Sequence, residues 1–180
     1  MSTTAPTALQ ERLIATLRVV PDFPSPGIMF QDVTPVLADA DLLRDAMAAL
    51  AAPWRDAGVT HVAGIESRGF IFGAPIAMAL GAGFIPVRKP GKLPFERATL
   101  DYALEYGSGQ LEVHVDACPH PARVLVVDDV LATGGTVSAT ADLVRRAGGD
   151  VVGVSVLLEL AFLRGRERLS DLDVQALLTL

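Results

Sequence analysis

Two adjacent carboxylates followed by a glycine-rich turn are the residues of this chain that point most directly to chemistry. Asp128 and Asp129 come directly after the apolar run 124–127, and the turn 132–136 has the sequence Ala-Thr-Gly-Gly-Thr. Carboxylates accept hydrogen bonds from a polyhydroxyl ligand or bind a cation. Glycines let backbone N–H groups surround an anion, and threonine hydroxyls add further donors. Together these groups predict a site for a sugar that carries a phosphate.

Each half of this run also has a structural explanation when it is taken alone. An Asp before a helix commonly caps it, and a Gly-Gly pair commonly forms a tight turn. The turn 132–136 lacks the lysine that follows the glycines of an NTPase phosphate loop, which argues against that class. Adjacent side chains on a strand point to opposite faces, so Asp128 and Asp129 reach one ligand only if the strand ends before them.

Apolar and amphipathic segments around this run alternate in a way that is typical of an α/β protein. We expect helices at 9–20, 69–80, 138–147 and 161–169, and another that Asp39 or Asp41 caps and whose apolar stripe reaches Trp54. We expect strands at 61–65, 84–88, 111–115, 124–127, 151–158 and 174–178. Strands that alternate with helices predict a mainly parallel sheet with right-handed crossovers.

The stretch 89–107 differs from the rest of the chain. It is polar, contains prolines and glycines, and shows no sustained period. A connection of this length is often a functional lid, so we expect a flexible loop here. Residues 1–35 are expected to hold the first helix and a turning segment, and the chain 1–180 is expected to form a single domain.

Composition narrows the classes of function. The chain has 180 residues, 51% of them hydrophobic, and a net charge of −6, which argues against binding to nucleic acid. Cys118 is the only cysteine, so neither an internal disulfide nor a cysteine-based metal cluster is expected. The uncharged run 70–87 contains glycines and prolines that favour a helix and a buried strand over a membrane span. The first ten residues lack a signal pattern, so we expect a cytoplasmic protein without a membrane partner.

Several segments together resemble one known family. The run 124–136 resembles the phosphoribosyl-diphosphate (PRPP) binding motif of the type I phosphoribosyltransferases. Segment 22–32 resembles the base-recognition segment of members that use adenine, and segment 65–73 resembles their diphosphate-binding loop. Segments 88–94 and 102–107 resemble their lid. The resemblance implies a Rossmann-like α/β fold with a mainly parallel sheet flanked by helices, a small hood and a flexible lid.

The resemblance also implies roles for individual residues. Asp128 and Asp129 would hold the ribose hydroxyls directly or through Mg²⁺. Their contact with the metal would be indirect, mostly through the substrate. The 5′-phosphate would be held by Ala132, Thr133, Gly134, Gly135 and Thr136. The diphosphate would be bound by Ser67, Arg68, Arg88, Lys89 and Lys92, although a solvated loop is the ordinary explanation for the last three. The resemblance further suggests a cis peptide bond between Ser67 and Arg68.

Base recognition is expected in the N-terminal segment. Phe30 would stack on the purine, and the backbone at Met29 and Gln31 would bind the edge of adenine, whose amine donates and whose ring nitrogens accept. A core aromatic is the ordinary alternative for Phe30. The two candidate catalytic residues are Glu105, as a general acid or base, and Arg68. The alternative for Glu105 is an ordinary loop carboxylate that pairs with Arg97 or Lys92.

The implied reaction joins adenine to PRPP and gives AMP and diphosphate, with Mg²⁺ as cofactor. Two alternatives stay open at this point. One is a phosphoribosyltransferase for another base, because fold does not determine substrate. The other is a non-catalytic regulator that senses PRPP or a nucleotide. A homodimer is expected from the resemblance and from the prevalence of two-fold dimers.

Overall fold

A computed structural model of the protein describes residues 6–103 and 108–180. The chain divides into two compact units, Met1–Ala48 and Ala49–Leu180. The expectation of one domain over 1–180 therefore stays a prediction.

The first unit contains a small antiparallel sheet that the sequence analysis missed. Helix α1 (Ala8–Thr16) is followed by strand β1 (Arg18–Pro21), which pairs with β2 (Met29–Asp32). The prediction of one helix over 9–20 was therefore too long, because Val19 and Val20 are β-branched and favour the strand. Helix α2 (Thr34–Ala38) and the start of α3 (Ala40–Ala51) complete the unit.

The N-terminus of α3 has the cap that the sequence predicts. The Asp39 carboxylate accepts a hydrogen bond from the backbone N–H of Leu42 at 2.9 Å. The helix stops before Pro53, in the second unit, where a 3₁₀ turn η1 (Ala52–Trp54) continues the chain, as expected for a proline that cannot extend an α-helix.

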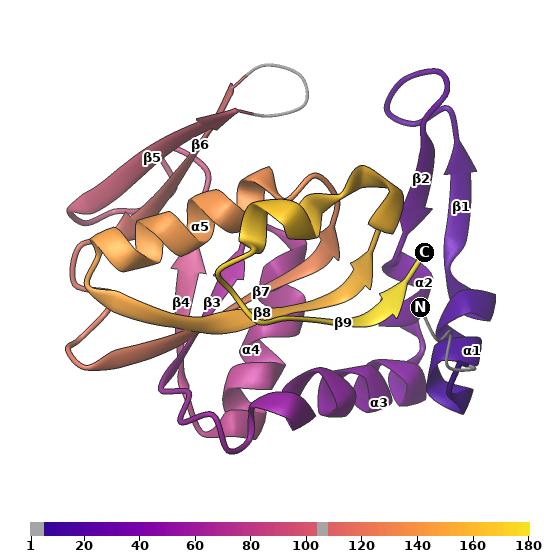
Figure 1. Cartoon of the computed structure of the whole chain (residues 1–180), viewed down its shortest axis with the longest axis horizontal. Coiled ribbons are helices and arrows are strands. Elements are labelled where there is room, and N and C mark those ends of the chain that lie inside the picture. The colour runs from indigo at the N-terminus through magenta and orange to yellow at the C-terminus, as the bar shows by residue number, and fades with distance from the viewer. Residues whose placement is uncertain (1–5, 104–107) are drawn as a thin grey trace. The chain divides into compact units, whose positions relative to one another are not determined.

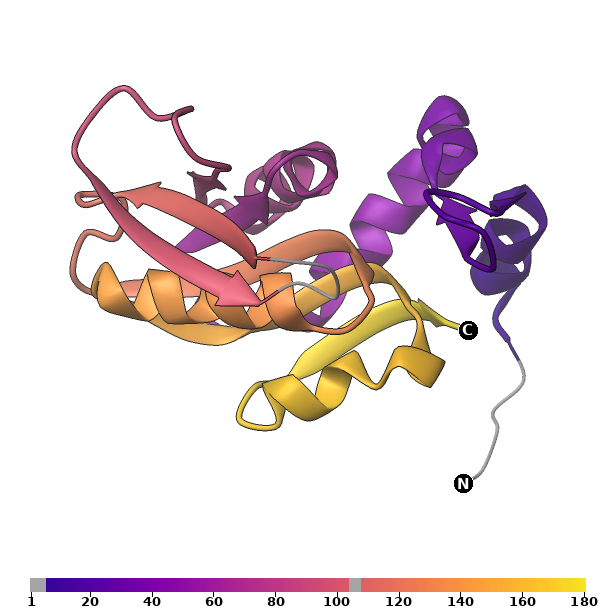
Figure 2. The same cartoon turned by 90° about the horizontal axis from the view of Figure 1, so that it is seen from above.

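The second unit is built on a five-stranded, entirely parallel sheet in the order β4-β3-β7-β8-β9. The sheet consists of β3 (His61–Ile65), β4 (Gly83–Val87), β7 (Ala122–Leu131), β8 (Gly149–Glu159) and β9 (Val174–Thr179). Figures 1 and 2 show α4 (Arg68–Leu80) on one face of the sheet and α5 (Gly135–Arg146) on the other. The expected α/β fold with a mainly parallel sheet between helices is confirmed.

The α5 side of the sheet also carries two short 3₁₀ turns, η2 (Ala161–Leu163) and η3 (Gly165–Leu169), where the sequence predicts one short helix (Figure 2). The run 70–87 divides into α4 and β4. Across residues 6–103 and 108–180, none of the helices is long and apolar enough to span a membrane.

The expected loop 89–107 contains a strand. Strand β5 (Arg97–Ala103) pairs in antiparallel fashion with β6 (Ser108–His114) and lies beside α5 (Figure 1). The prediction that 89–107 has no regular hydrophobic period was wrong for this strand. Its residues Ala98, Leu100 and Tyr102 alternate with polar residues and pack on the core. Residues 104–107, between the two strands, lie outside the described residues.

Strand β7 is the buried centre of this unit. Val124, Leu125, Val126 and Val127 expose none of their surface, as a strand covered on both faces requires. The strand does not end at Val127, as the sequence analysis assumed, but continues through both acidic residues to Leu131. The predicted strand end at Val127 is therefore wrong, so the condition for both carboxylates to reach one ligand is not met by the strand itself.

Candidate functional site

Parallel pairing brings three loops to one edge of the sheet. The register aligns Ile65 of β3 with Val87 of β4, and Gly64 with Val127 of β7. Because parallel strands end at the same edge, the loops that follow β3, β4 and β7 are neighbours there. The backbone N–H of Glu66 donates to the carbonyl of Val87 at 2.9 Å and ties two of these loops together. This carboxyl edge is where open α/β sheets bind their ligands.

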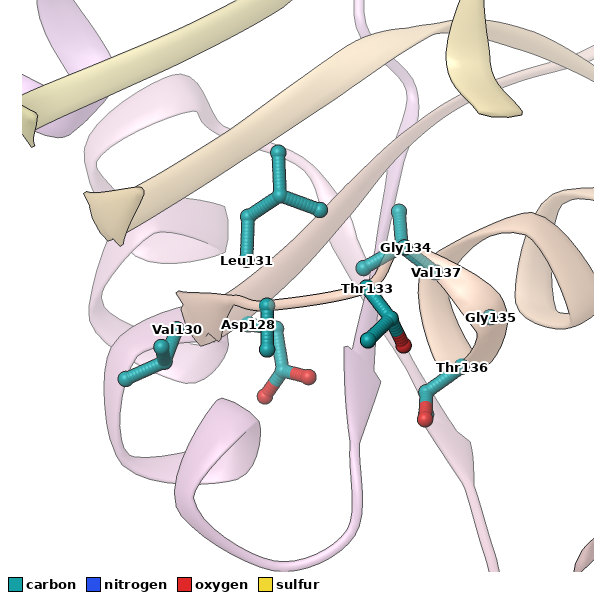
Figure 3. A pocket seen from close by; sticks show the side chains of 9 residues that line it. Asp128, Val130, Leu131, Thr133, Gly134, Gly135, Thr136 and Val137 are labelled. Atoms are coloured by element: carbon teal, nitrogen blue, oxygen red, sulfur yellow. The ribbon is translucent and has the colours of Figure 1, made fainter. Parts of the chain in front are cut away.

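The loop after β7 encloses a small hollow of about 70 Å³. Its lining residues are Asp128, Val130, Leu131, Ala132, Thr133, Gly134, Gly135, Thr136 and Val137. The Asp128 carboxylate and the hydroxyls of Thr133 and Thr136 face this space (Figure 3). All five residues of the Ala-Thr-Gly-Gly-Thr turn thus line one hollow together with one of the two carboxylates.

The start of helix α5 supplies the anion-binding character of the hollow. Gly134 is the N-cap residue of α5, has a φ of 78° and gives the helix no side-chain cap. Its first-turn N–H groups therefore have no side-chain acceptor from the N-cap, and the helix dipole adds partial positive charge there. Only glycine adopts this φ readily, so the turn needs Gly134 for its shape.

The two carboxylates take different positions. Asp129 is buried and is not among the residues that line the hollow; its Oδ2 lies 2.7 Å from Nε of Arg68. Asp128 lines the hollow, and its Oδ1 accepts a hydrogen bond from the Asp129 N–H at 3.0 Å. Both lie against the first turn of α4, since a Cβ added to Gly69 would stand 3.0 Å from Oδ1 of Asp128. The absent side chain of Gly69 is what lets the strand and helix approach so closely.

Burial raises the pKa of both carboxyl groups. For Asp128 desolvation is the largest cause, the nearby Asp129 charge adds to it, and the pKa stands well above its usual value. Desolvation also raises the pKa of Asp129, although the Arg68 guanidinium opposes it. The site therefore holds negative charge in surroundings that solvate it poorly, and a ligand that donates hydrogen bonds or carries a cation would relieve this.

The basic residues after β4 are held by two carboxylates that the sequence analysis did not single out. Oε2 of Glu66 accepts from Nε of Arg88 at 3.0 Å and from the Lys89 N–H at 2.9 Å. Burial favours a higher pKa for Glu66, but these hydrogen bonds outweigh it and hold the pKa below its usual value. Buried Glu112 accepts from the Gly91 N–H at 3.0 Å and from Arg97 at 2.9 Å.

These contacts give the basic turn a defined shape. Arg88 exchanges two backbone hydrogen bonds with Glu112, while Lys89 and Lys92 have exposed side chains. The structure thus places Arg88, Lys89 and Lys92 in one turn at the edge of the sheet. Because Arg97 pairs with Glu112, it is not an isolated partner for a lid carboxylate, and Glu105 itself lies outside the described residues.

Two details of the loop after β3 differ from the sequence analysis or extend it. The cis peptide bond joins Glu66 to Ser67 and not Ser67 to Arg68, so the predicted position was wrong by one residue. Ser67 is exposed and precedes the first turn of α4. Tyr102 of β5 was also missed: its hydroxyl accepts a long hydrogen bond, 3.4 Å, from Thr136.

The predicted base-recognition residues lie on β2 in the first unit. The Met29 side chain is 56% exposed, whereas Phe30 and Gln31 are half-buried. The rings of Phe30 and Phe23 meet edge to face, with centroids 5.1 Å apart. Their role in binding a base stays a prediction.

Comparison with known proteins gives the class first. Residues 37–176 match the family model described as "Phosphoribosyl transferase domain". An adenine phosphoribosyltransferase of Thermobifida fusca (strain YX) is 57% identical over 163 residues, which are 91% of this chain and 93% of that protein. One from Myxococcus xanthus (strain DK1622) is 57% identical over 96% of this chain and 94% of its own length.

A solved structure agrees with these sequences. The crystal structure of adenine phosphoribosyltransferase from Rhodothermus marinus DSM 4252 is 52% identical and superposes with a TM-score of 0.90, covering 96% of this chain and 98% of that one. The chain therefore belongs to the adenine phosphoribosyltransferase family.

We expect replacement of the hollow's carboxylate to stabilise the protein at alkaline pH. A carboxyl group with a raised pKa in the folded state contributes most stability below its unfolded pKa and loses it as pH rises through the folded pKa. Asp128→Asn keeps an oxygen for the Asp129 N–H and removes this loss. Its free energy of unfolding, measured by urea denaturation, should equal or exceed that of the wild type at pH 8 and depend less on pH.

Asp142→Asn is the matched control, because this carboxylate is exposed on α5. It removes a negative charge from an exposed position, and its free energy of unfolding at pH 8 should stay within about 0.5 kcal/mol of the wild type. A loss of more than about 1 kcal/mol at pH 8 in Asp128→Asn alone, the typical size for a destabilising substitution, would contradict the unfavourable burial of Asp128.

Proposed function

We propose that the chain acts as its family does: it transfers the 5-phosphoribosyl group from PRPP to adenine and releases AMP and diphosphate. The observation that supports this most strongly is the hollow of Asp128 and residues 130–137, with a carboxylate at one side and a helix N-terminus at the other. A ribose phosphate needs both, since its hydroxyls donate and its phosphate is an anion.

Within this proposal the hollow binds the 5′-phosphoribosyl group. The backbone from Ala132 to Thr136 and the hydroxyls of Thr133 and Thr136 hold the 5′-phosphate at the start of α5. Asp128 accepts hydrogen bonds from the ribose hydroxyls. Asp129 acts on the ligand only indirectly, because its ion pair with Arg68 fixes the guanidinium at the edge of the site.

The leaving diphosphate is assigned to the loops after β3 and β4. Arg68 would contact it as a catalytic residue, with the Ser67 backbone beside it, and Arg88, Lys89 and Lys92 would add positive charge. The Glu66 contact holds Arg88 and the backbone of Lys89 in place before substrate arrives. Such preorganised charge stabilises the diphosphate as it gains negative charge in the transition state.

The carboxylates fit a magnesium ion that arrives with the substrate. Across residues 6–103 and 108–180, three or more His, Cys, Asp or Glu side chains do not gather into a metal site. Mg²⁺ is commonly held by one or two carboxylates together with substrate phosphates. Asp128 is the better placed of the two, because its carboxylate lines the hollow, whereas Oδ2 of Asp129 is already ion-paired with Arg68. Bound at Asp128, Mg²⁺ would neutralise charge on the diphosphate.

Adenine recognition is assigned to β2. Phe30 would stack on the purine, and the backbone of Met29 and Gln31 would bind its edge. Glu105 would move or stabilise the proton at the base, and the anomeric carbon would gain positive charge as the diphosphate leaves. A covalent nucleophile is not needed for this step. The cytoplasmic location stays a prediction.

An assay of free bases tests the proposed function. With PRPP and Mg²⁺, adenine should give AMP and diphosphate, whereas hypoxanthine, guanine and orotate should react at least about a hundredfold more slowly, as a site that hydrogen-bonds its substrate discriminates. Chelation of Mg²⁺ should abolish turnover, and excess Mg²⁺ should restore it. Product from another base but not from adenine would refute the base assignment, and tight PRPP binding without turnover would indicate a regulator.

We also propose that two copies pair through α4. Its residues Ile71 and Met78 are exposed, Met78 by 84%, and lie seven residues apart, which places them on one face of the helix. Light scattering should give twice the 18.9 kDa of the chain at micromolar concentration, and Met78→Glu should shift the mass toward the monomer. Phe162→Glu is the matched exposed control. An 18.9 kDa species for the wild type would contradict the pairing.

A further inference from the structure

The loop that forms the hollow has a second neighbour, on the side away from the ligand space. Gly165, the first residue of η3, is buried and is not one of the residues that line the hollow. A Cβ added to Gly165 would collide with the carbonyl oxygen of Ala132 and stand 2.9 Å from the backbone nitrogen of Gly134. A Cβ added to Gly134 would in turn collide with the carbonyl oxygen of Gly165. The two backbones are therefore in direct contact.

This contact requires a glycine for its size and not for its conformation. The φ of Gly165 lies outside the left-handed range, so its φ does not by itself require a glycine. Gly134, by contrast, has a φ of 78°. A methyl group at position 165 would thus leave the local backbone allowed and would push on Ala132 and Gly134. Gly165→Ala therefore tests the contact with the loop without requiring a strained φ at position 165.

Gly165 is itself held firmly by its neighbours. Arg166 pairs with the buried carboxylate of Glu159, with Nε to Oε1 at 3.0 Å and a second nitrogen to Oε2 at 2.5 Å. The same guanidinium donates to the carbonyl of Val174 on β9 at 2.7 Å. Leu160 N–H donates to Leu131 O at 2.9 Å and joins the end of β8 to the start of the loop. Hydrogen bonds at Leu160 and at Arg166 thus tie the segment 160–166 to the sheet at both of its ends.

The loop needs such support because its own sequence constrains it little. Gly134 and Gly135 are conformationally permissive, and α5 begins without a side-chain cap. The direction of the first N–H groups of α5 decides how well they meet an anion. A rigid backbone pressed against residues 132–134 limits the positions that the loop can take.

We propose that Gly165 is a positioning residue for the 5′-phosphate: its bare backbone holds the loop 132–134 from outside the hollow, and the Arg166–Glu159 pair holds Gly165. This inference rests on the proposed function, since it assumes that the hollow binds the phosphate of PRPP and AMP. Neither Gly165 nor Arg166 touches the ligand in this account.

Gly165→Ala tests the inference through a difference between the two substrates. The KM for PRPP and the Kd for AMP should rise about tenfold, which corresponds to about 1.4 kcal/mol, while the KM for adenine changes less than about twofold. Adenine carries no phosphate, so a general loss of structure would not spare it selectively. Arg166→Lys keeps the charge but loses the two-pronged pairing, and should raise the KM for PRPP by a smaller factor in the same direction.

Gly153→Ala is the matched control. Its added Cβ would collide with the rings of Trp54 and stand 2.8 Å from the carbonyl oxygen of Asp173, without touching residues 132–134. It should lower the melting temperature and change the KM for PRPP less than Gly165→Ala does. Thr136→Ala tests the hollow itself and should raise the KM for PRPP. If Thr136→Ala raises it while Gly165→Ala and Arg166→Lys do not, the positioning role is wrong and the proposed function stands. If all three leave it unchanged, the assignment of the hollow fails as well.

If Gly165→Ala does not fold, Arg166→Lys carries the test alone. An unchanged KM for PRPP and an unchanged Kd for AMP in Arg166→Lys would then overturn the inference.

Discussion

Parallel pairing of β3 and β7 is the constraint on which the rest of the site depends. The ladder that aligns Gly64 with Val127 makes both strands end at one edge, so the first turn of α4 and the loop before α5 become neighbours. The approach is close enough that Gly69 has no room for a Cβ beside Val127 and Asp128. A sheet slipped by one residue would separate these loops and invert every side chain on the strand.

This arrangement places negative charge where water solvates it poorly. Asp128 and Asp129 both have raised pKa values, and Arg68 offsets only part of the unfavourable burial. A protein selected for stability alone would replace such groups, so their presence fits a site that a ligand completes. The basic turn is the opposite case, because Glu66 and Glu112 satisfy its backbone and Arg88 without a ligand.

The sequence predicted what local patterns determine. The buried runs of β3, β7 and β8 and the glycine-rich turn are visible because apolar runs and glycines carry their own signal. The β-branched residues of β1 and the alternation of β5 are also present in the sequence. The helical stripe before β1 and the prolines of 89–107 nevertheless favoured a helix and a loop in these two places. The supporting contacts of Glu112 and Gly165 could not be predicted, because each joins residues far apart in the chain and no local pattern marks its partner. The sequence also assigned Asp128 and Asp129 the same role, because they are neighbours in the chain. Only the structure shows that Asp128 lines the hollow while Asp129 pairs with Arg68.

The central claim is that the N-terminus of α5 binds the phosphate of the ligand. Hydrogen exchange of the backbone amides, followed by mass spectrometry with and without AMP, tests it directly. Bound phosphate should slow exchange at 134–137 by about tenfold or more, because those N–H groups would donate to it, while β9 should be unaffected. Unchanged exchange at 134–137 under conditions where AMP is bound would contradict the account.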